Sequence, residues 1–139
     1  MLLKIVKSNM KIFVFTIIIL SPLFTKKIFA QIEDSNKVYQ YFEVDELPIF
    51  NHQNKNLSEY VWSKISWPNN FDVQGEVVVS YVVRKNGKVE NVLIIKSLCS
   101  VCDELVVDLF ENIPIFEPGK VNSKPVNVRM FFPIKFILK

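Results

Sequence analysis

The chain has 139 residues, enough for one domain of ordinary size and too few for a second one of any size. Its formal net charge of +3 comes from the first 30 residues, which hold five of the 17 basic residues and none of the 14 acidic ones. The rest of the chain therefore carries 12 basic and 14 acidic residues, a net charge of −2. Nucleic-acid binding needs a concentrated basic surface, so this balance argues against a nucleic-acid-binding protein.

Residues 1–30 have the pattern of an export signal. Three lysines precede an apolar run at residues 12–24, and Ala30 offers a small side chain directly before Gln31. The run has 13 residues, fewer than the ~20 that a helix needs to cross a bilayer. We predict a signal peptide that is cleaved between Ala30 and Gln31 and delivers the chain to the periplasm. The alternative is an uncleaved, short inner-membrane anchor.

The polar residues 31–46 are expected to form a short lead-in to a domain at 47–139. From Asn56, apolar residues recur at helical spacing as far as Ile65, and the Asn56 side chain can cap the first turn. Pro68 is expected to end this helix, because a proline cannot continue it.

Two strands joined by a hairpin are predicted next. Valine-rich alternation covers residues 75–84, and a second alternating run covers 89–96. Asn86-Gly87 lies between them, and both residues tolerate the positive φ angles of a tight hairpin turn.

A second helix is predicted from Cys102 to Asn112, where apolar residues again recur at helical spacing. Ser100 and Asp103 have a spacing similar to that of a capping box, and Pro114 ends the helix.

From Pro125 the chain alternates once more as far as Leu138, which predicts a last strand. The order is then helix, strand, strand, helix, strand. This order is typical of an α+β domain in which a small three-stranded antiparallel sheet packs against two helices.

Pro133 lies in the middle of the last strand and has no N–H, so its nitrogen should face the free edge of the sheet. Backbone groups of alternate residues point to the same side. The residues assigned to this free edge are Asn127, Arg129, Phe131, Pro133 and Lys135. Those expected to pair inward and to bury their side chains are Met130, Phe132, Ile134 and Phe136. A free edge offers unpaired N–H and C=O groups to an extended peptide.

Cys99 and Cys102 form the only motif that suggests chemistry. A C-x-x-C pair at a helix start can be redox-active, although redox enzymes of the thioredoxin type place it in a βαβ unit rather than after a hairpin. We expect a structural disulfide formed during export, with two free thiols or a redox pair as alternatives.

His52 is the sole histidine, and we interpret it as a loop residue rather than a ligand or a base. Trp62 and Trp67 are expected to pack in the core and at a helix end. A zinc site would need two ligands beyond the cysteines, so no metal and no cofactor are expected. Without a Ser/His/Asp or phosphate-binding arrangement, we expect neither an enzyme nor a small-molecule substrate.

Six motifs follow one another in register from Leu47 to Leu138. They are Leu47-Pro48-Ile49-Phe50, Phe71 to Arg84, Asn86-Gly87-Lys88-Val89, Phe116-Glu117-Pro118-Gly119-Lys120, Lys124-Pro125-Val126 and Phe132-Pro133-Ile134-Lys135-Phe136. Together they resemble the C-terminal domain of the TonB family of energy transducers. Asn51-His52 stands where the family often has paired glycines.

The resemblance implies that the last strand receives the TonB box, an extended segment of outer-membrane TonB-dependent receptors. Members that couple to a proton channel have a histidine in their membrane anchor and a long Pro-rich spacer. The leader here holds no histidine, and no such spacer follows it.

Three functions therefore stay open. The first is a TonB-like module that binds receptor segments by strand addition during energised transport. The second is a free-standing envelope interaction domain, which could form a homodimer through its open edge. The third is a thiol-redox accessory that acts through Cys99 and Cys102.

Overall fold

The structure is a computed structural model, which describes residues 36–66 and 72–137. Ala30 and Gln31 at the expected cleavage site and the Trp67-Pro68 pair lie outside the described residues. Residues from Val38 onward form one compact unit. Among the described residues, no helix has the length and apolar character that crossing a membrane would take.

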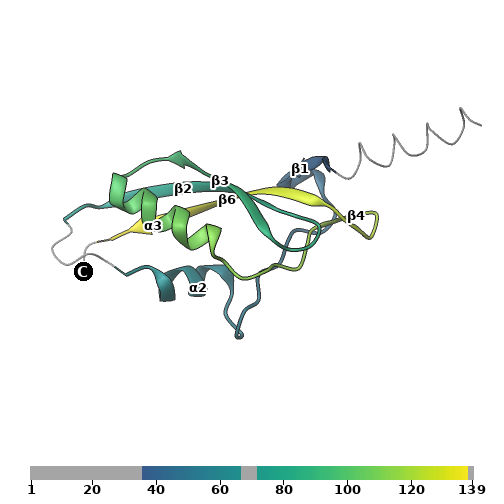
Figure 1. The fold of residues 1–139 in the computed structure, drawn as a ribbon, viewed down its shortest axis with the longest axis horizontal. Helices are drawn as coiled ribbons and strands as arrows, with labels where there is room; N and C mark the ends of the chain where they lie inside the picture. Colours follow the sequence, from purple (N-terminus) through teal and green to yellow (C-terminus); the bar gives the residue numbers. More distant parts are fainter. Residues whose placement is uncertain (1–35, 67–71, 138–139) are drawn as a thin grey trace, which may run out of the picture. The chain divides into compact units, whose positions relative to one another are not determined.

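The compact unit contains a four-stranded mixed sheet, two α-helices and a small hairpin (Figure 1). In chain order its elements are β1 (Val38–Gln40), the 3-10 helix η1 (Tyr41–Glu43), α2 (Leu57–Lys64), β2 (Gly75–Val83), β3 (Val89–Lys96), α3 (Ser100–Glu111), β4 (Lys120–Val121), β5 (Lys124–Pro125) and β6 (Asn127–Phe136). The strand order in the sheet is β1-β6-β2-β3, and β4 pairs with β5 alone. The expected α+β class with two helices is confirmed.

The long antiparallel pairing of β2 with β6 forms the centre of the sheet. It runs from Gly75 opposite Phe136 to Val83 opposite Val128 without a shift in register. Met130, Phe132, Ile134 and Phe136 belong to the core or pack directly against it, as predicted from their alternation. Their partners in the core include Val61 of α2 and Phe110 of α3, so both helices pack on this one face of the sheet.

The sheet has one strand more than the three-stranded antiparallel sheet that was expected. The additional strand is β1, which comes from the lead-in segment and runs parallel to β6. Val38, Tyr39 and Gln40 lie opposite residues 127–129. A strand of three residues is too short to produce a recognisable alternation, so only its tertiary pairing reveals it.

The β2–β3 hairpin is present, but its loop has three residues rather than a tight turn with two positive φ angles. The Arg84 N–H donates to the Lys88 carbonyl and the Gly87 N–H to the Arg84 carbonyl, each at 2.8 Å. In this loop only Gly87 has a positive φ angle, of 84°. A turn followed by a glycine in the left-handed region is the usual form of a three-residue hairpin loop.

Both helices begin with a capping residue, which is the expected one in α2 and a different one in α3. Asn56 caps α2 by accepting from the Glu59 N–H at 3.0 Å, and the Glu59 carboxylate accepts from the Asn56 N–H at the same distance. In α3 the cap is Cys99 rather than Ser100. Asp103 reaches back to the Ser97 hydroxyl and the Leu98 N–H, so the expected capping box with Ser100 does not form.

Trp62 was expected in the core, and this was wrong. Its side chain lies on the outer side of α2 and is 44% exposed, whereas the preceding Val61 is fully buried. The helix thus presents a narrow apolar face to the sheet, and position 62 falls outside it.

The segment before α2 is fastened to the segment after α3 by backbone hydrogen bonds. Ile49 and Glu117 exchange two of them, at 2.8 and 3.0 Å, and Lys120 exchanges two with Glu46, at 2.9 and 3.1 Å. The ring of Phe116 in the same segment lies 5.0 Å from that of Phe50. These contacts place the β4–β5 hairpin, which the sequence analysis did not predict, beside the start of β6.

Gly87 should be the least replaceable residue of the hairpin loop. A Cβ added there would lie 2.1 Å from the Phe116 carbonyl oxygen, and the φ angle of 84° is itself strained for other residues. We expect Gly87→Ala to lower the free energy of unfolding by at least about 1–3 kcal/mol, the usual cost of such strain. Urea unfolding of purified protein measures it.

The matched control is Asn86→Ala in the same loop. It removes one exposed hydrogen bond, from the Lys88 N–H to Asn86 Oδ1 at 3.0 Å, and should cost less than about 1 kcal/mol. Equal stabilities of the two variants would contradict the role assigned to Gly87.

Candidate functional site

The outer edge of β6, the side facing away from β2, is the candidate binding site. Opposite β2, Pro133 pairs with Val78 in a ladder that has no register shift. Because Pro133 has no N–H, the pairing is undisturbed only if its nitrogen points away from β2. Alternation along the strand then gives the β6 edge the residues expected from the sequence, Asn127, Arg129, Phe131, Pro133 and Lys135. These backbone directions stay a prediction.

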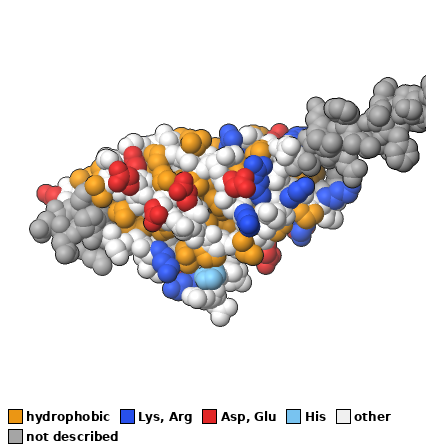
Figure 2. Space-filling view, in the orientation of Figure 1, with side chains coloured by type: hydrophobic (Ala, Val, Ile, Leu, Met, Phe, Trp, Pro, Cys, Tyr) orange, Lys and Arg blue, Asp and Glu red, His pale blue; other side chains and the backbone are white. Residues whose placement is uncertain are grey.

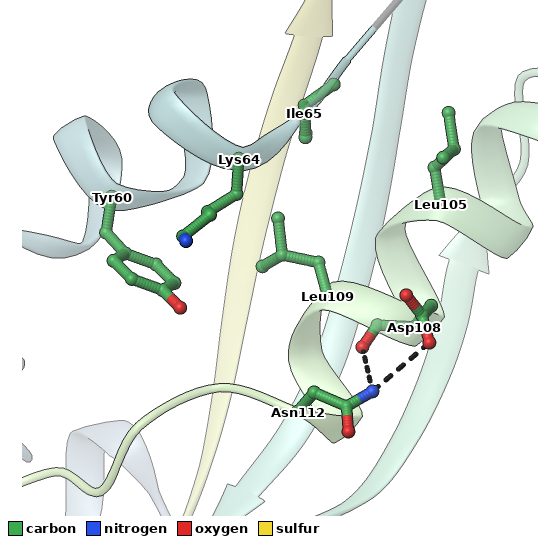
Figure 3. Close-up of a pocket in the computed structure, with 7 residues that line it drawn as sticks. All are labelled: Tyr60, Lys64, Ile65, Leu105, Asp108, Leu109 and Asn112. Atoms are coloured by element: carbon green, nitrogen blue, oxygen red, sulfur yellow. Dashed lines mark hydrogen bonds between the residues drawn. The ribbon is translucent and has the colours of Figure 1, made fainter.

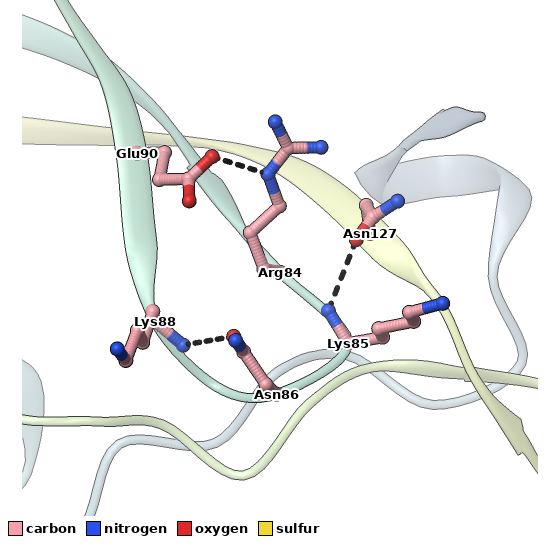
Figure 4. A network of polar contacts seen from close by, with 6 residues as sticks. All are labelled: Arg84, Lys85, Asn86, Lys88, Glu90 and Asn127. Atoms are coloured by element: carbon pink, nitrogen blue, oxygen red, sulfur yellow. Dashed lines mark hydrogen bonds and ion pairs between the residues drawn. The ribbon is translucent and has the colours of Figure 1, made fainter. Parts of the chain in front are cut away.

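Asn127 and Arg129 lie where β1 pairs with β6, opposite Val38 and Gln40. The Asn127 side chain is buried, with 3% exposed, and its Oδ1 accepts from the Lys85 N–H at 3.0 Å (Figure 4). This bond ties the start of β6 to the hairpin loop. Asn127 therefore has a structural role in addition to its place on the β6 edge, which its residue type alone did not reveal.

Phe131, Pro133 and Lys135 are exposed, and Phe131 is 41% exposed. Their side chains stand on the face of the sheet that the helices leave open. Phe131 lies opposite Ser80, and so does Leu93 of β3, which is 57% exposed. At the β6 edge, Phe131 is thus an apolar side chain that a bound strand could cover, whereas Leu93 lies two strands away, beyond β2.

The outer edge of β3 is less suited to strand addition. Its pairing with β2 shifts register twice, between Val78 and Val79 and between Ser80 and Val82. Asn91 in this strand has a φ angle of 52°, in the left-handed region. Bulges of this kind twist an edge and interrupt its hydrogen-bonding pattern. The side of β6 that faces away from β2 is more regular, although β1 pairs with its first three residues.

Charges are unevenly placed on the molecule. Figure 2 shows acidic side chains over the region of α3 and basic side chains gathered toward the end where β4 lies. On α3 the exposed acidic residues include Glu104 and Asp108. At the other end, Arg84 pairs with Glu90 at 2.6 Å (Figure 4) and Lys120 with Glu46 at 2.7 Å. The Glu46 carboxylate raises the pKa of Lys120 through its hydrogen bond and its charge.

Cys99 and Cys102 are joined by a disulfide at the start of α3. Cys102 is 1% exposed and belongs to the core, while Cys99 is half-buried and packs against it. The neighbouring Asp103 carboxylate already accepts hydrogen bonds from Ser97 and Leu98. This position favours a role in fixing the helix start over a role in thiol exchange, which requires an accessible sulfur.

A hollow of about 250 Å³, which no pattern in the sequence predicted, lies between α2 and α3. Its lining residues are Tyr60, Lys64, Ile65, Leu105, Asp108, Leu109 and Asn112 (Figure 3). The Asn112 amide donates to the Asp108 carbonyl at 2.8 Å and to its carboxylate at 3.1 Å. The lining residues include no histidine, cysteine or serine.

His52 lies in a turn closed by two hydrogen bonds with Lys55, at 3.0 and 3.2 Å. Its ring is 5.7 Å from that of Tyr60 and 6.4 Å from that of Phe50, so it packs among aromatic rings. In the described ranges, no three histidine, cysteine or acidic side chains gather as a metal site would require.

Residues 71–138 match the family described as Gram-negative bacterial TonB protein C-terminal. This part of the chain belongs to the TonB C-terminal domain family. The matched residues include β2, β3, α3 and β6, and so the whole candidate site apart from β1. No curated protein and no solved structure matches the chain.

The TonB C-terminal family is associated with the cell envelope, and it suggests a role in transport. The family's domain is non-catalytic, and its members interact with outer-membrane receptors in general. The family therefore directs attention to a surface that binds other proteins, and the β6 edge is such a surface.

Oxidation of Cys99 and Cys102 in the exported protein stays a prediction. Both should resist alkylation in freshly isolated, unreduced protein, because export exposes them to an oxidising compartment and only two residues separate them. Mass spectrometry after alkylation measures the result. Two alkylated thiols would rule the disulfide out. Replacing both residues with serine should leave partner binding unchanged.

Proposed function

We propose that this chain is a periplasmic TonB-like module that binds an extended segment of an outer-membrane TonB-dependent receptor. Binding occurs by strand addition to the β6 edge, during energised transmembrane transport. The observation that carries the proposal is the regular pairing of β6 with β2 in a TonB C-terminal domain, with Pro133 in the part of β6 that β1 does not pair with. The chain is expected to need no cofactor and to catalyse no reaction.

Strand addition alone gives modest affinity. Each new backbone hydrogen bond contributes roughly 0.5–1.5 kcal/mol net, while ordering the incoming backbone costs about 1–2 kcal/mol per residue. Burial of apolar surface must therefore add to the hydrogen bonds. Phe131 supplies such surface beside the edge, because its side chain is 41% exposed on the open face of the sheet. The resulting complex should form and dissociate readily, as repeated engagement of receptors requires.

A second candidate is an envelope interaction domain that forms a homodimer. Leu93 and Ile95 of β3, which are 57% and 59% exposed, favour it because exposed apolar residues on an edge strand are common at interfaces. Sedimentation of the purified protein separates the two proposals. A stable dimer without receptor binding would favour the second.

Receptor binding at the β6 edge is testable by crosslinking in cells. A photo-crosslinking residue at Lys135, which is exposed on the edge, should capture a TonB-dependent receptor identified by mass spectrometry. The same residue at Ser58, exposed on α2, is the matched control and should capture none. Capture of receptor from Ser58 but not from Lys135 would place the binding surface elsewhere.

Proline substitutions test the direction of the β6 backbone. Phe132→Pro should remove an N–H that donates to β2 and lower the free energy of unfolding by about 3 kcal/mol. Phe131→Pro should spare folding, because its N–H faces the β6 edge, and should weaken receptor capture. Urea unfolding and crosslinking from Lys135 measure the two effects. If Phe131→Pro unfolds the protein while Phe132→Pro is tolerated, the assigned directions are reversed.

Export should end with cleavage between Ala30 and Gln31. The intact mass of the exported protein is then expected to correspond to a chain that begins at Gln31. A chain that still begins at Met1 would mean a membrane anchor, and would bring the function closer to that of a complete energy transducer.

A further inference from the structure

The proposed binding edge already carries a strand of the same chain. β1 runs parallel to β6, with Val38 opposite Asn127, Tyr39 opposite Val128 and Gln40 opposite Arg129. In Figure 1 this segment lies beside the part of β6 that is nearest β4. The pairing uses the same outward-facing backbone groups of β6 that an incoming strand would use.

Little of the β6 edge is left for a partner while β1 is in place. Asn127 and Arg129 lie in the region that pairs with β1. The ring of Tyr41, the first residue of η1, meets that of Phe131 edge-on at a centroid distance of 6.3 Å. Pro133 has no N–H to offer. Among the five edge residues, only the N–H groups of Phe131 and Lys135 then lie beyond the residues paired with β1, which is too little for a strand of several residues.

The covering segment is weakly attached to the rest of the fold. β1 has three residues, all half-buried, and η1 contains no buried residue. Tyr41 and Phe42 are 49% and 71% exposed, and the core cluster includes no residue of β1 or η1. Displacing this segment would therefore leave the packing between the sheet and the helices intact.

The chain directly after η1 is firmly anchored, so a displaced β1 stays close to its site. The N–H groups of Asp45 and Glu46 both donate to the Lys120 carbonyl, at 3.0 and 3.1 Å. The Asp45 carboxylate in turn accepts from the Asn122 N–H at 2.7 Å. A short tether keeps the effective concentration of a linked segment high, which makes β1 an efficient competitor despite its few contacts.

We propose that β1 is a built-in, displaceable occupant of the β6 edge, and that a partner strand binds by displacing it. The competition keeps the edge covered when no partner is present and lowers the apparent affinity for any strand that binds there. This inference rests on the proposed function for the identity of the partner, but the occupancy of the edge by β1 can be tested without a receptor.

The direction of the β1 backbone identifies the residue to change. The Gln40 N–H donates to the Glu43 carboxylate at 2.7 Å, so it faces away from β6. By alternation, the N–H of Tyr39 faces β6, and that of Val38 faces away. Tyr39→Pro should therefore release β1, whereas Val38→Pro is a matched control that places a proline in the same strand without removing a bond to β6. Tyr39→Val controls for loss of the ring.

The probe is a fluorescent synthetic peptide with the sequence of residues 36–43, which reproduces β1 and η1 of this chain. Its affinity is measured by fluorescence anisotropy with the full-length chain in detergent. Tyr39→Pro is expected to bind it about tenfold more tightly than wild type, because the edge is then vacant in most molecules. Val38→Pro and Tyr39→Val should bind like wild type. Equal binding by all four proteins would overturn the proposal.

A measurement on wild type covers the case in which Tyr39→Pro does not fold. Saturating, unlabelled peptide should accelerate hydrogen exchange at the Tyr39 amide of the protein, since the peptide takes the place of β1. No change in its exchange would overturn the proposal. The proposal would also be overturned if the wild-type protein is a dimer and Tyr39→Pro is a monomer. In that case β1 would pair with β6 of a second copy of the chain.

Receptor capture separates this inference from the proposed function. In cells, Tyr39→Pro should increase capture from Lys135 relative to Val38→Pro. If the peptide results hold but no receptor is captured from any variant, the proposed function fails and β1 remains the occupant of the edge. If a receptor is captured equally from all variants and the peptide does not distinguish them, the role of β1 fails and the proposed function stands.

Discussion

The antiparallel pairing of β2 with β6 is the constraint on which the rest of the structure depends. It continues over the whole of β2 without a register shift, and so it fixes which side chains of both strands meet the helices. Val77, Val79 and Tyr81 are at most 1% exposed on that side. The same register leaves Pro133 and Phe131 on the open face. A slip by one residue would exchange the two faces, and the core and the binding edge would be lost together.

Local patterns in the sequence predicted the elements that contain enough residues to show a period. The alternation in β2 and β6 predicted both strands and the inward set of β6, because nine and ten residues give a clear signal. Asn56 predicted the start of α2, since its side chain needs only the backbone N–H of Glu59. Pro133 indicated which side of β6 faces away from β2. A residue without an N–H cannot donate a hydrogen bond to a neighbouring strand, so its nitrogen is expected on the other side.

Features that depend on distant partners could not be predicted in this way. β1 has too few residues to alternate visibly, and its partner β6 is at the other end of the domain. The bond from Lys85 to the buried Asn127 joins the hairpin loop to the start of β6, and no local pattern relates the two. The β4–β5 hairpin did carry a local signal: Asn122 and Ser123, both with positive φ angles, separate residues that pair with each other. Asparagine tolerates that region, so this signal could have been recognised.

An edge strand that must accept a partner also has to avoid pairing with other copies of the chain. Pro133 and Lys135 limit such pairing, and β1 covers the edge at residues 127–129. Residue-resolved amide hydrogen exchange, with the captured receptor segment bound, tests most directly whether the partner pairs with β6. The amides of Phe131 and Lys135 should exchange more slowly in the complex, while those of Phe132 and Ile134, which are expected to donate to β2, should be unchanged. Slower exchange along the outer edge of β3, with none at Lys135, would contradict strand addition to β6.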